Sequence, residues 1–62
     1  MYQVCLISTR METKGRLLFY RMFGKIEQAL EYMQDVKKHS VWLKIELRQH
    51  KENQGYKVLM NL

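Results

Sequence analysis

Residues that could carry nucleophilic or acid–base chemistry are few in this sequence, and none has a partner at a useful spacing. The single cysteine, Cys5, stands among apolar residues of a predicted strand, where a thiol is usually a small buried hydrophobe rather than a nucleophile. His39 ends a predicted helix, where a cation suits the helix dipole, and His50 begins a polar turn. Glu27 and Glu31 are one helical turn apart on a face with lysines nearby, which is typical of a solvated surface.

Motifs that mark enzymes or metal sites are also missing. The chain has no HExxH pair, no phosphate-binding glycine loop and no CxxC motif. One cysteine and two histidines exclude an internal disulfide and cannot readily complete a four-ligand zinc site. A chain of 62 residues also leaves little concavity for a pocket of ~300 Å³ or more, unless a dimer forms one. We therefore expect no catalytic residues, no metal, no cofactor and no enzymatic activity.

Alternating apolar and polar residues predict four β-strands. They cover residues 2–9, 16–23, 41–48 and 56–62. Polar segments that end in Gly15 and Gly55 join these strands in pairs, because glycine can take the positive φ of a hairpin turn. In the fourth strand we expect one side to hold Tyr56, Val58, Met60 and Leu62, and the other side to hold Lys57, Leu59 and Asn61.

Residues 25–39 follow helical periodicity instead. Their apolar stripe consists of Ile26, Ala29, Leu30, Met33 and Val36. Gly24 interrupts the second strand and can serve as the N-cap of the helix, with Glu27 in the first turn. The stripe must be buried against something, and the sheet is the only other element available.

The resulting order is ββαββ, which defines an α+β protein with a single small domain over residues 1–62. We expect a four-stranded, mostly antiparallel sheet with the helix packed on one face. Because both connections to the helix are very short, the sheet order stays open, and 2-1-3-4 is the order we favour. The other face then stays open to solvent or to a partner. On it we expect Trp42, Lys44, Glu46, Arg48, Lys57 and Leu59, together with Arg21 if the odd positions of the second strand point outward.

The chain is basic, with 11 Lys and Arg residues against 6 Asp and Glu residues, a net charge of +5. Charges balance over residues 25–39, so the excess belongs to the strands and turns.

An apolar share of 47% is too high for a disordered chain. No apolar run exceeds four residues, whereas a membrane helix needs ~20. A lone thiol and the lack of a secretory signal favour the cytoplasm, without membrane association.

A domain this small buries only ~60% of the surface of its unfolded chain, and self-association commonly adds stability. Tyrosine, tryptophan, methionine and arginine are enriched at interfaces, and this chain has four tyrosines and five methionines. We expect a small non-catalytic binding or regulatory protein, a homodimer or the partner of another protein. The residues expected to bind are Trp42, Lys44, Arg48, Lys57, Leu59 and Arg21.

The alternative is a protein that binds single-stranded RNA or DNA with the same face. Lysines and arginines would contact phosphates, while Trp42, together with Phe19 if the odd positions of the second strand point outward, would stack on bases. No signature of a known RNA- or DNA-binding module supports this alternative, and the basic residues are spread over strands and turns.

Overall fold

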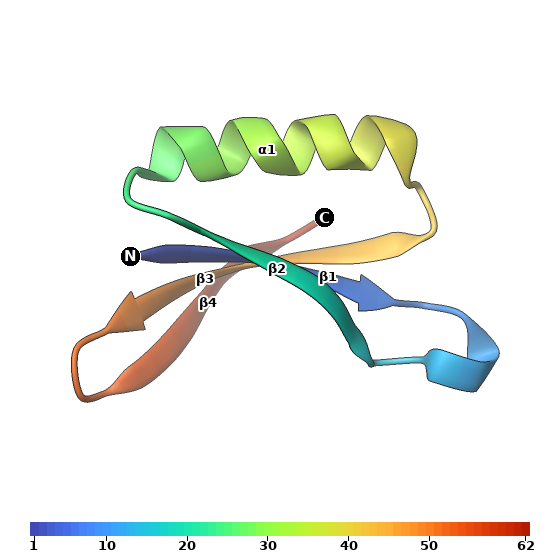
Figure 1. The fold of residues 1–62 in the computed structure, drawn as a ribbon, viewed down its shortest axis with the longest axis horizontal. Coiled ribbons are helices and arrows are strands. Elements are labelled where there is room, and N and C mark those ends of the chain that lie inside the picture. The colour runs from blue at the N-terminus through green and yellow to red at the C-terminus, as the bar shows by residue number, and fades with distance from the viewer.

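The computed structural model describes residues 1–62 and follows the predicted ββαββ order (Figure 1). Its elements are β1 (Tyr2–Ser8), the short 3₁₀ helix η1 (Met11–Thr13), β2 (Leu17–Phe23), α1 (Ile26–His39), β3 (Leu43–Lys51) and β4 (Gly55–Asn61). Gly15 and Gly55 adopt φ angles of 84° and 75°, a region that glycine enters at little cost. The two predicted turn glycines are therefore confirmed.

All three strand pairings are antiparallel, and they arrange the sheet in the order β2-β1-β3-β4. The predicted α+β class and the predicted strand order are both confirmed. β1 and β2 form one hairpin, β3 and β4 form the other, and α1 connects the two. Because β1 and β3 are neighbours, β2 and β4 become the edges of the sheet.

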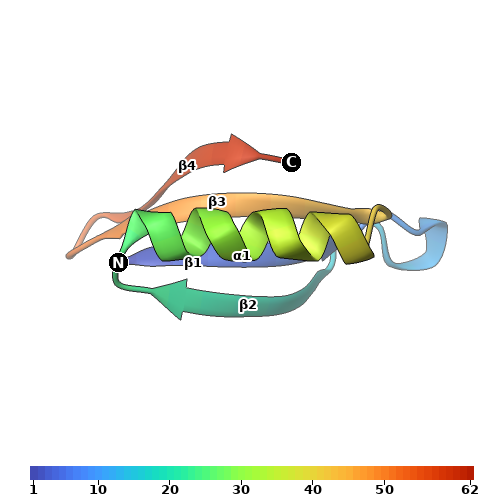
Figure 2. The same cartoon turned by 90° about the horizontal axis from the view of Figure 1, so that it is seen from above.

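α1 lies on one face of the sheet and covers mainly the two central strands (Figure 2). A helix with its side chains is about 10–12 Å across, and strands are about 4.7–4.9 Å apart, so one helix spans about two strands. The core between α1 and the sheet consists of Ala29 and Met33 of the helix and of Val4, Leu6, Leu43, Ile45 and Leu47 of the central strands. β2 lies outside this cover, and six of its seven residues are exposed. The structure holds no helix with the length and apolar character that crossing a membrane requires.

The register of the sheet assigns each strand residue to a face. Val4 and Leu6 belong to the core under α1, so Cys5 and Ile7 between and after them point to the opposite side. We call this helix-free side the open face. Residues that lie opposite one another in an antiparallel ladder share a face, so each pairing with β1 or β3 places a residue of β2 or β4.

The predicted faces of β4 are half wrong because this strand contains a β-bulge. Leu47 pairs with Met60 and Arg48 pairs with Val58, which leaves Leu59 without a partner in β3. Leu59 packs against the core, on the side of α1. Met60 keeps its predicted side, but the extra residue reverses the first half of the strand. Tyr56 and Val58 therefore lie on the open face, while Lys57, opposite Gln49, lies on the helix side.

Several boundaries differ from the predicted ones, most by a single residue, and those of α1 and β3 change the place of residues discussed above. α1 begins after Lys25, whose side chain makes no capping hydrogen bond, so Gly24 is not the N-cap. β3 begins at Leu43, which leaves Val41, 77% exposed, and Trp42 in the preceding turn. β3 continues to Lys51, so His50 belongs to a strand rather than to a turn.

Candidate interaction surface

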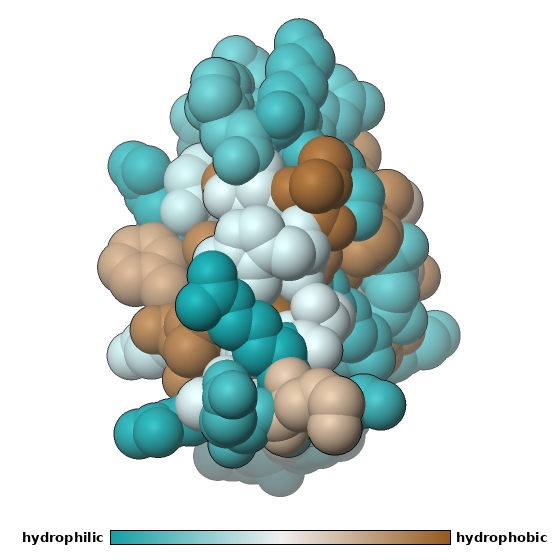
Figure 3. Space-filling view, turned by 90° about the vertical axis from the view of Figure 1, so that its right-hand side faces the viewer, coloured by the Kyte–Doolittle hydropathy of each residue, from teal (hydrophilic) through white to brown (hydrophobic).

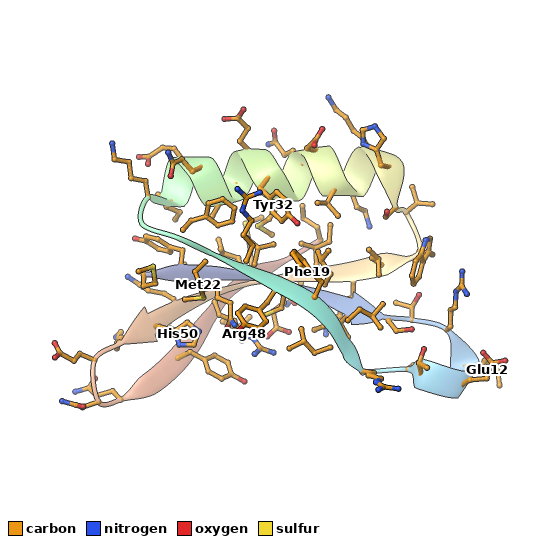
Figure 4. The ribbon with its side chains drawn as sticks, in the orientation of Figure 1. Glu12, Phe19, Met22, Tyr32, Arg48 and His50 are labelled. Carbon is orange, nitrogen blue, oxygen red and sulfur yellow. The ribbon has the colours of Figure 1, made fainter.

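The open face collects side chains from all four strands. They are Leu17, Tyr20 and Met22 of β2, Gln3, Cys5 and Ile7 of β1, Lys44, Glu46, Arg48 and His50 of β3, and Tyr56, Val58 and Asn61 of β4. Figure 4 shows Arg48 and His50 on the side of the sheet that faces away from α1. The central strands thus contribute the polar groups, and the edge strands contribute the large apolar and aromatic groups.

An ion pair occupies the middle of this face. Nε of Arg48 donates a hydrogen bond of 2.6 Å to Oε1 of Glu46, two residues away on β3. The two side chains are only 20% and 11% exposed. The hydrogen bond to Glu46 is the main cause that raises the pKa of Arg48. The guanidinium also lies 4.4 Å from the centre of the Tyr56 ring. Arg48 is therefore a fixed, neutralised cation rather than a free one.

His50 and Gln3 form a second polar contact on the same face. Nε2 of His50 donates to Oε1 of Gln3 over 2.7 Å, between neighbouring strands β3 and β1. The imidazole also lies 5.6 Å from the Tyr56 ring, centre to centre. No buried side-chain nitrogen or oxygen in the structure lacks a hydrogen-bond partner. Arg48, Glu46 and His50 already have hydrogen-bond partners within the chain. A binding partner that covers this face therefore does not have to supply new ones.

Cys5 lies in the centre of the face but is fully covered by its neighbours, with no exposed surface. Tyr20 and Glu46 are its partners in the two ladders. Burial, the largest cause, raises the pKa of the thiol; the Arg48 charge lowers it and the Glu46 charge raises it. A protonated, covered thiol is a poor nucleophile. The prediction that Cys5 is a small buried hydrophobe is confirmed.

Two apolar bands flank this polar centre, one along each edge strand. Their side chains are between 40% and 52% exposed: Leu17, Tyr20 and Met22 on β2, and Tyr56 and Val58 on β4. If a large side chain presents about 150–250 Å² when fully exposed, the two bands together expose about 350–550 Å². Contiguous patches of about 300–600 Å² on small proteins are often functional, and the two bands reach that size together only for a partner that spans the polar centre between them.

Two of the six predicted binding residues, Lys44 and Arg48, lie on the open face as expected. Trp42 is 41% exposed but lies in the turn before β3, where the Arg10 guanidinium stacks 4.6 Å from the centre of its ring. The Thr9 hydroxyl also donates a hydrogen bond to the Trp42 carbonyl. Trp42 thus joins the β1–β2 connection to the start of β3, next to the open face rather than on it.

The other three predicted residues lie on the helix side of the edge strands. Leu59 packs against the core, and Lys57 pairs with Gln49, as described above. Arg21 pairs with Val4, and its guanidinium lies 5.3 Å from the Phe23 ring and 5.4 Å from the Tyr32 ring. The six residues therefore do not form one surface.

The residues that sequence reasoning missed are Leu17, Tyr20 and Met22 on β2, and Tyr56 and Val58 on β4. In β2 both faces are equally apolar, so periodicity could not rank them. In β4 the bulge at Leu59 shifts the phase, and no glycine or proline marks it.

A groove of about 690 Å³ runs between α1 and β2 on the helix side. This is more concavity than the chain length suggested. Its lining is mostly polar and includes Arg21, Glu31, Tyr32, Asp35 and Lys38. No group of three or more histidine, cysteine, aspartate or glutamate side chains could hold a metal ion.

The fold and this surface define a small α+β protein with a partly apolar, helix-free sheet face. No protein-family model, curated protein or solved structure matches the chain.

Proposed function

We propose that this chain is a small non-catalytic binding protein that regulates or adapts another protein by covering part of its surface, and that the open face is its contact surface. The observation that carries the proposal is the composition of that face. Half-exposed Tyr20, Met22, Tyr56 and Val58 surround an ion pair whose polar atoms are already bonded.

The polar centre favours docking because most of its desolvation has already occurred on folding. Burying a charge without a partner is expensive, but Arg48 and Glu46 are paired and largely covered before any partner arrives. Covering the flanking tyrosines and aliphatic side chains then contributes favourable apolar burial. The bands are about 14 Å apart, three strand spacings, so the matching partner surface is flat and apolar rather than a single extended peptide.

The distribution of charge favours a protein partner over a nucleic acid. Lys44 and Arg48 against Glu46 give the open face a net charge of only +1 out of the total of +5. Arg48 is held by Glu46, which leaves Lys44 as the one strand cation free to meet a phosphate there. Binding of single-stranded nucleic acid depends on several free cations.

The test compares two lysine substitutions on β4 that differ only in the face they occupy. Val58→Lys places a charge on the open face, and Met60→Lys places it on the helix side at similar exposure. Proteins retained by the wild-type chain from cells that express it are identified by mass spectrometry and purified, and the affinity of each variant is measured by titration. We expect at least a tenfold loss for Val58→Lys and little change for Met60→Lys.

A mixed-sequence single-stranded RNA serves as the competing probe in the same titration. Equal losses for both variants would contradict the assignment of the open face. Tight RNA binding that weakens steeply with salt and is lost in Lys44→Ala would replace the protein partner by a nucleic acid.

A further inference from the structure

β2 is an exposed edge strand with apolar side chains on both of its faces. Figure 2 shows it at one side of the sheet, with no element beyond it. Leu17, Leu18, Phe19, Tyr20 and Met22 are all between 40% and 53% exposed. In the end view of Figure 3, apolar side chains gather on both flanks of the molecule below the hydrophilic helix. Such an edge is a template for another strand unless charge, proline or a bulge blocks it.

The free backbone groups of this edge can be identified from the hydrogen bonds of β1. Each residue of an antiparallel strand directs its N–H and C=O toward one neighbour, and successive residues alternate. The Met1 carbonyl accepts from His50 in β3, and the Ser8 amide donates to Arg16 on the other side. Even-numbered residues of β1 therefore bond to β2, at Phe19 and Arg21. Tyr20 and Met22 between and after them direct their amides and carbonyls away from the sheet.

β2 is better suited to pairing than β4, the other edge. From Phe19 to Phe23, five consecutive residues of β2 have regular partners, because its irregularity lies before Phe19. β4 is interrupted at Leu59, and Lys57 adds a charge. Bulges and charged side chains are devices that protect edges. β2 has no bulge from Phe19 to Phe23, and its one charge there, Arg21, lies beside the rings of Phe23 and Tyr32.

We propose that a second copy of this chain pairs with β2 in antiparallel fashion about a two-fold axis at Tyr20. This register places Tyr20 opposite Tyr20 of the second copy, as a hydrogen-bonded pair. It also places Arg21 of each copy opposite Phe19 of the other copy, so that the dimer contains two such pairs. The guanidinium, already beside Phe23 and Tyr32, then gains a third aromatic ring. Figure 4 shows Phe19 on β2 and Tyr32 on α1 above it.

Charge selects this register over its nearest competitor. Residues whose backbone N–H and C=O point away from the sheet, such as Tyr20 and Met22, must pair with one another across the contact. Pairing Tyr20 with Met22 of the second copy also meets this condition, and it places the axis at Arg21. That arrangement brings Arg21 directly opposite Arg21 of the second copy, at about 4.5 Å between Cα atoms. Like charges opposite one another destabilise a sheet. Moving the axis to Tyr20 replaces this repulsion by two contacts between Arg21 and Phe19.

The size of the contact indicates a reversible dimer. The five apolar side chains of β2 expose about 350–600 Å² per copy, if a large side chain presents about 150–250 Å². Edge pairing covers only part of each side chain, so the pair buries less than about 700–1,200 Å², at or below the lower limit of about 1,000 Å² for a specific interface. The two helices lie on the same side about 19 Å apart, four strand spacings, so they do not clash. The result is an eight-stranded sheet with a continuous open face.

Two charge substitutions at one position test the register. Phe19→Glu places a carboxylate opposite Arg21 of the second copy, whereas Phe19→Lys places a second cation there. We expect Phe19→Glu to dimerise at least as well as wild type and Phe19→Lys to need at least tenfold more protein. Met60→Lys, the same change on the helix side of β4, should leave dimerisation unchanged. Mass is followed by light scattering over a concentration series, against 7.6 kDa for the monomer, and circular dichroism checks the fold.

Cysteine cross-linking then reads the register directly. All proteins carry Cys5→Ala, so that the introduced thiols are the only ones. Tyr20→Cys keeps Arg21 and should cross-link with itself, because the two copies of residue 20 face each other at about 5.5 Å between Cα atoms. A mixture of Tyr20→Cys and Met22→Cys chains, whose thiols face each other only when the axis lies at Arg21, should form few mixed disulfides. A monomer up to millimolar concentration, equal loss in both Phe19 variants, or preferential cross-linking of Tyr20→Cys with Met22→Cys would overturn the proposal. Since Phe19 lies on the helix side, such a failure leaves binding by the open face untouched.

Discussion

Removing the carboxylate of Glu46 should destabilise the whole domain through the arginine that it leaves behind. In Glu46→Ala, Arg48 keeps its ring contact with Tyr56 but loses the 2.6 Å hydrogen bond, with its side chain only 20% exposed. Breaking a fully buried pair costs about 3–5 kcal/mol, and a fully exposed pair is worth about 0–1 kcal/mol. The partial cover here places the expected loss at about 1–2 kcal/mol, near the range for hydrogen bonds to charged groups.

That loss is large for a domain of 62 residues. Proteins are stable by about 0.05–0.15 kcal/mol per residue, which gives this chain about 3–9 kcal/mol in total. Since 1 kcal/mol shifts the melting temperature of a small domain by about 4–8 °C, we expect Glu46→Ala to melt at least several degrees lower. Urea titration followed by circular dichroism measures the free energy of unfolding, and an unchanged slope shows that the unfolded state is unaffected.

A double-mutant cycle separates the pair from the side chains that form it. Arg48→Met removes the charge and keeps an unbranched side chain, and Glu46→Ala/Arg48→Met removes both charges. We expect the double variant to be more stable than the sum of the single losses implies, because no unpaired charge remains. Strictly additive losses would mean that the two groups do not interact. The claim that they form a fixed ion pair at the centre of the open face would then be wrong.

Two further predictions concern the buried residues. The raised pKa of Cys5 keeps its thiol protonated in the folded chain after the unfolded chain has begun to ionise near its ordinary value of 9.0. Stability should therefore fall as pH rises through and above 9.0, by more in wild type than in Cys5→Ala, and an equal fall in both proteins would refute this cause. Ile45 has no exposed surface in the core under α1, so Ile45→Ala should cost about 2–5 kcal/mol. Given the small total stability, that variant should be partly unfolded at room temperature by circular dichroism, whereas the exposed Val41→Ala should melt like wild type.

The sequence predicted the fold well because its periodicities are strong where tertiary burial is strong. One core contains the inward-facing residues of three elements: Val4 and Leu6 of β1, Ile45 of β3, and the helical stripe with Met33. The helical stripe can be buried only against the sheet, and a single sequence contains that local pattern. The short connections left the strand order open, and the pairing of β1 with β3 is known only from the structure.

The interaction surface was harder to predict because it is formed at the sheet edges. One helix covers two strands, so side chains on both faces of β2 remain exposed, and alternation cannot identify a functional side. The bulge at Leu59 depends on how β4 pairs with β3. It places Tyr56 and Val58 on the open face, where Lys57 was expected. Arg21 was expected beside the open face, but its pairing with Val4 turns it toward Tyr32 on α1.

Hydroxyl-radical footprinting tests most directly whether the open face is the surface that this protein uses. Oxidation of Tyr56 is compared between the purified chain and the chain in lysate of the cells that express it, with Met11, 93% exposed, as the internal reference. Tyr56 lies on β4, far from the proposed β2 pairing, so dimerisation alone does not cover it. We expect Tyr56 to be protected severalfold in lysate while Met11 is unchanged. Equal oxidation of Tyr56 in both samples would contradict a partner on the open face.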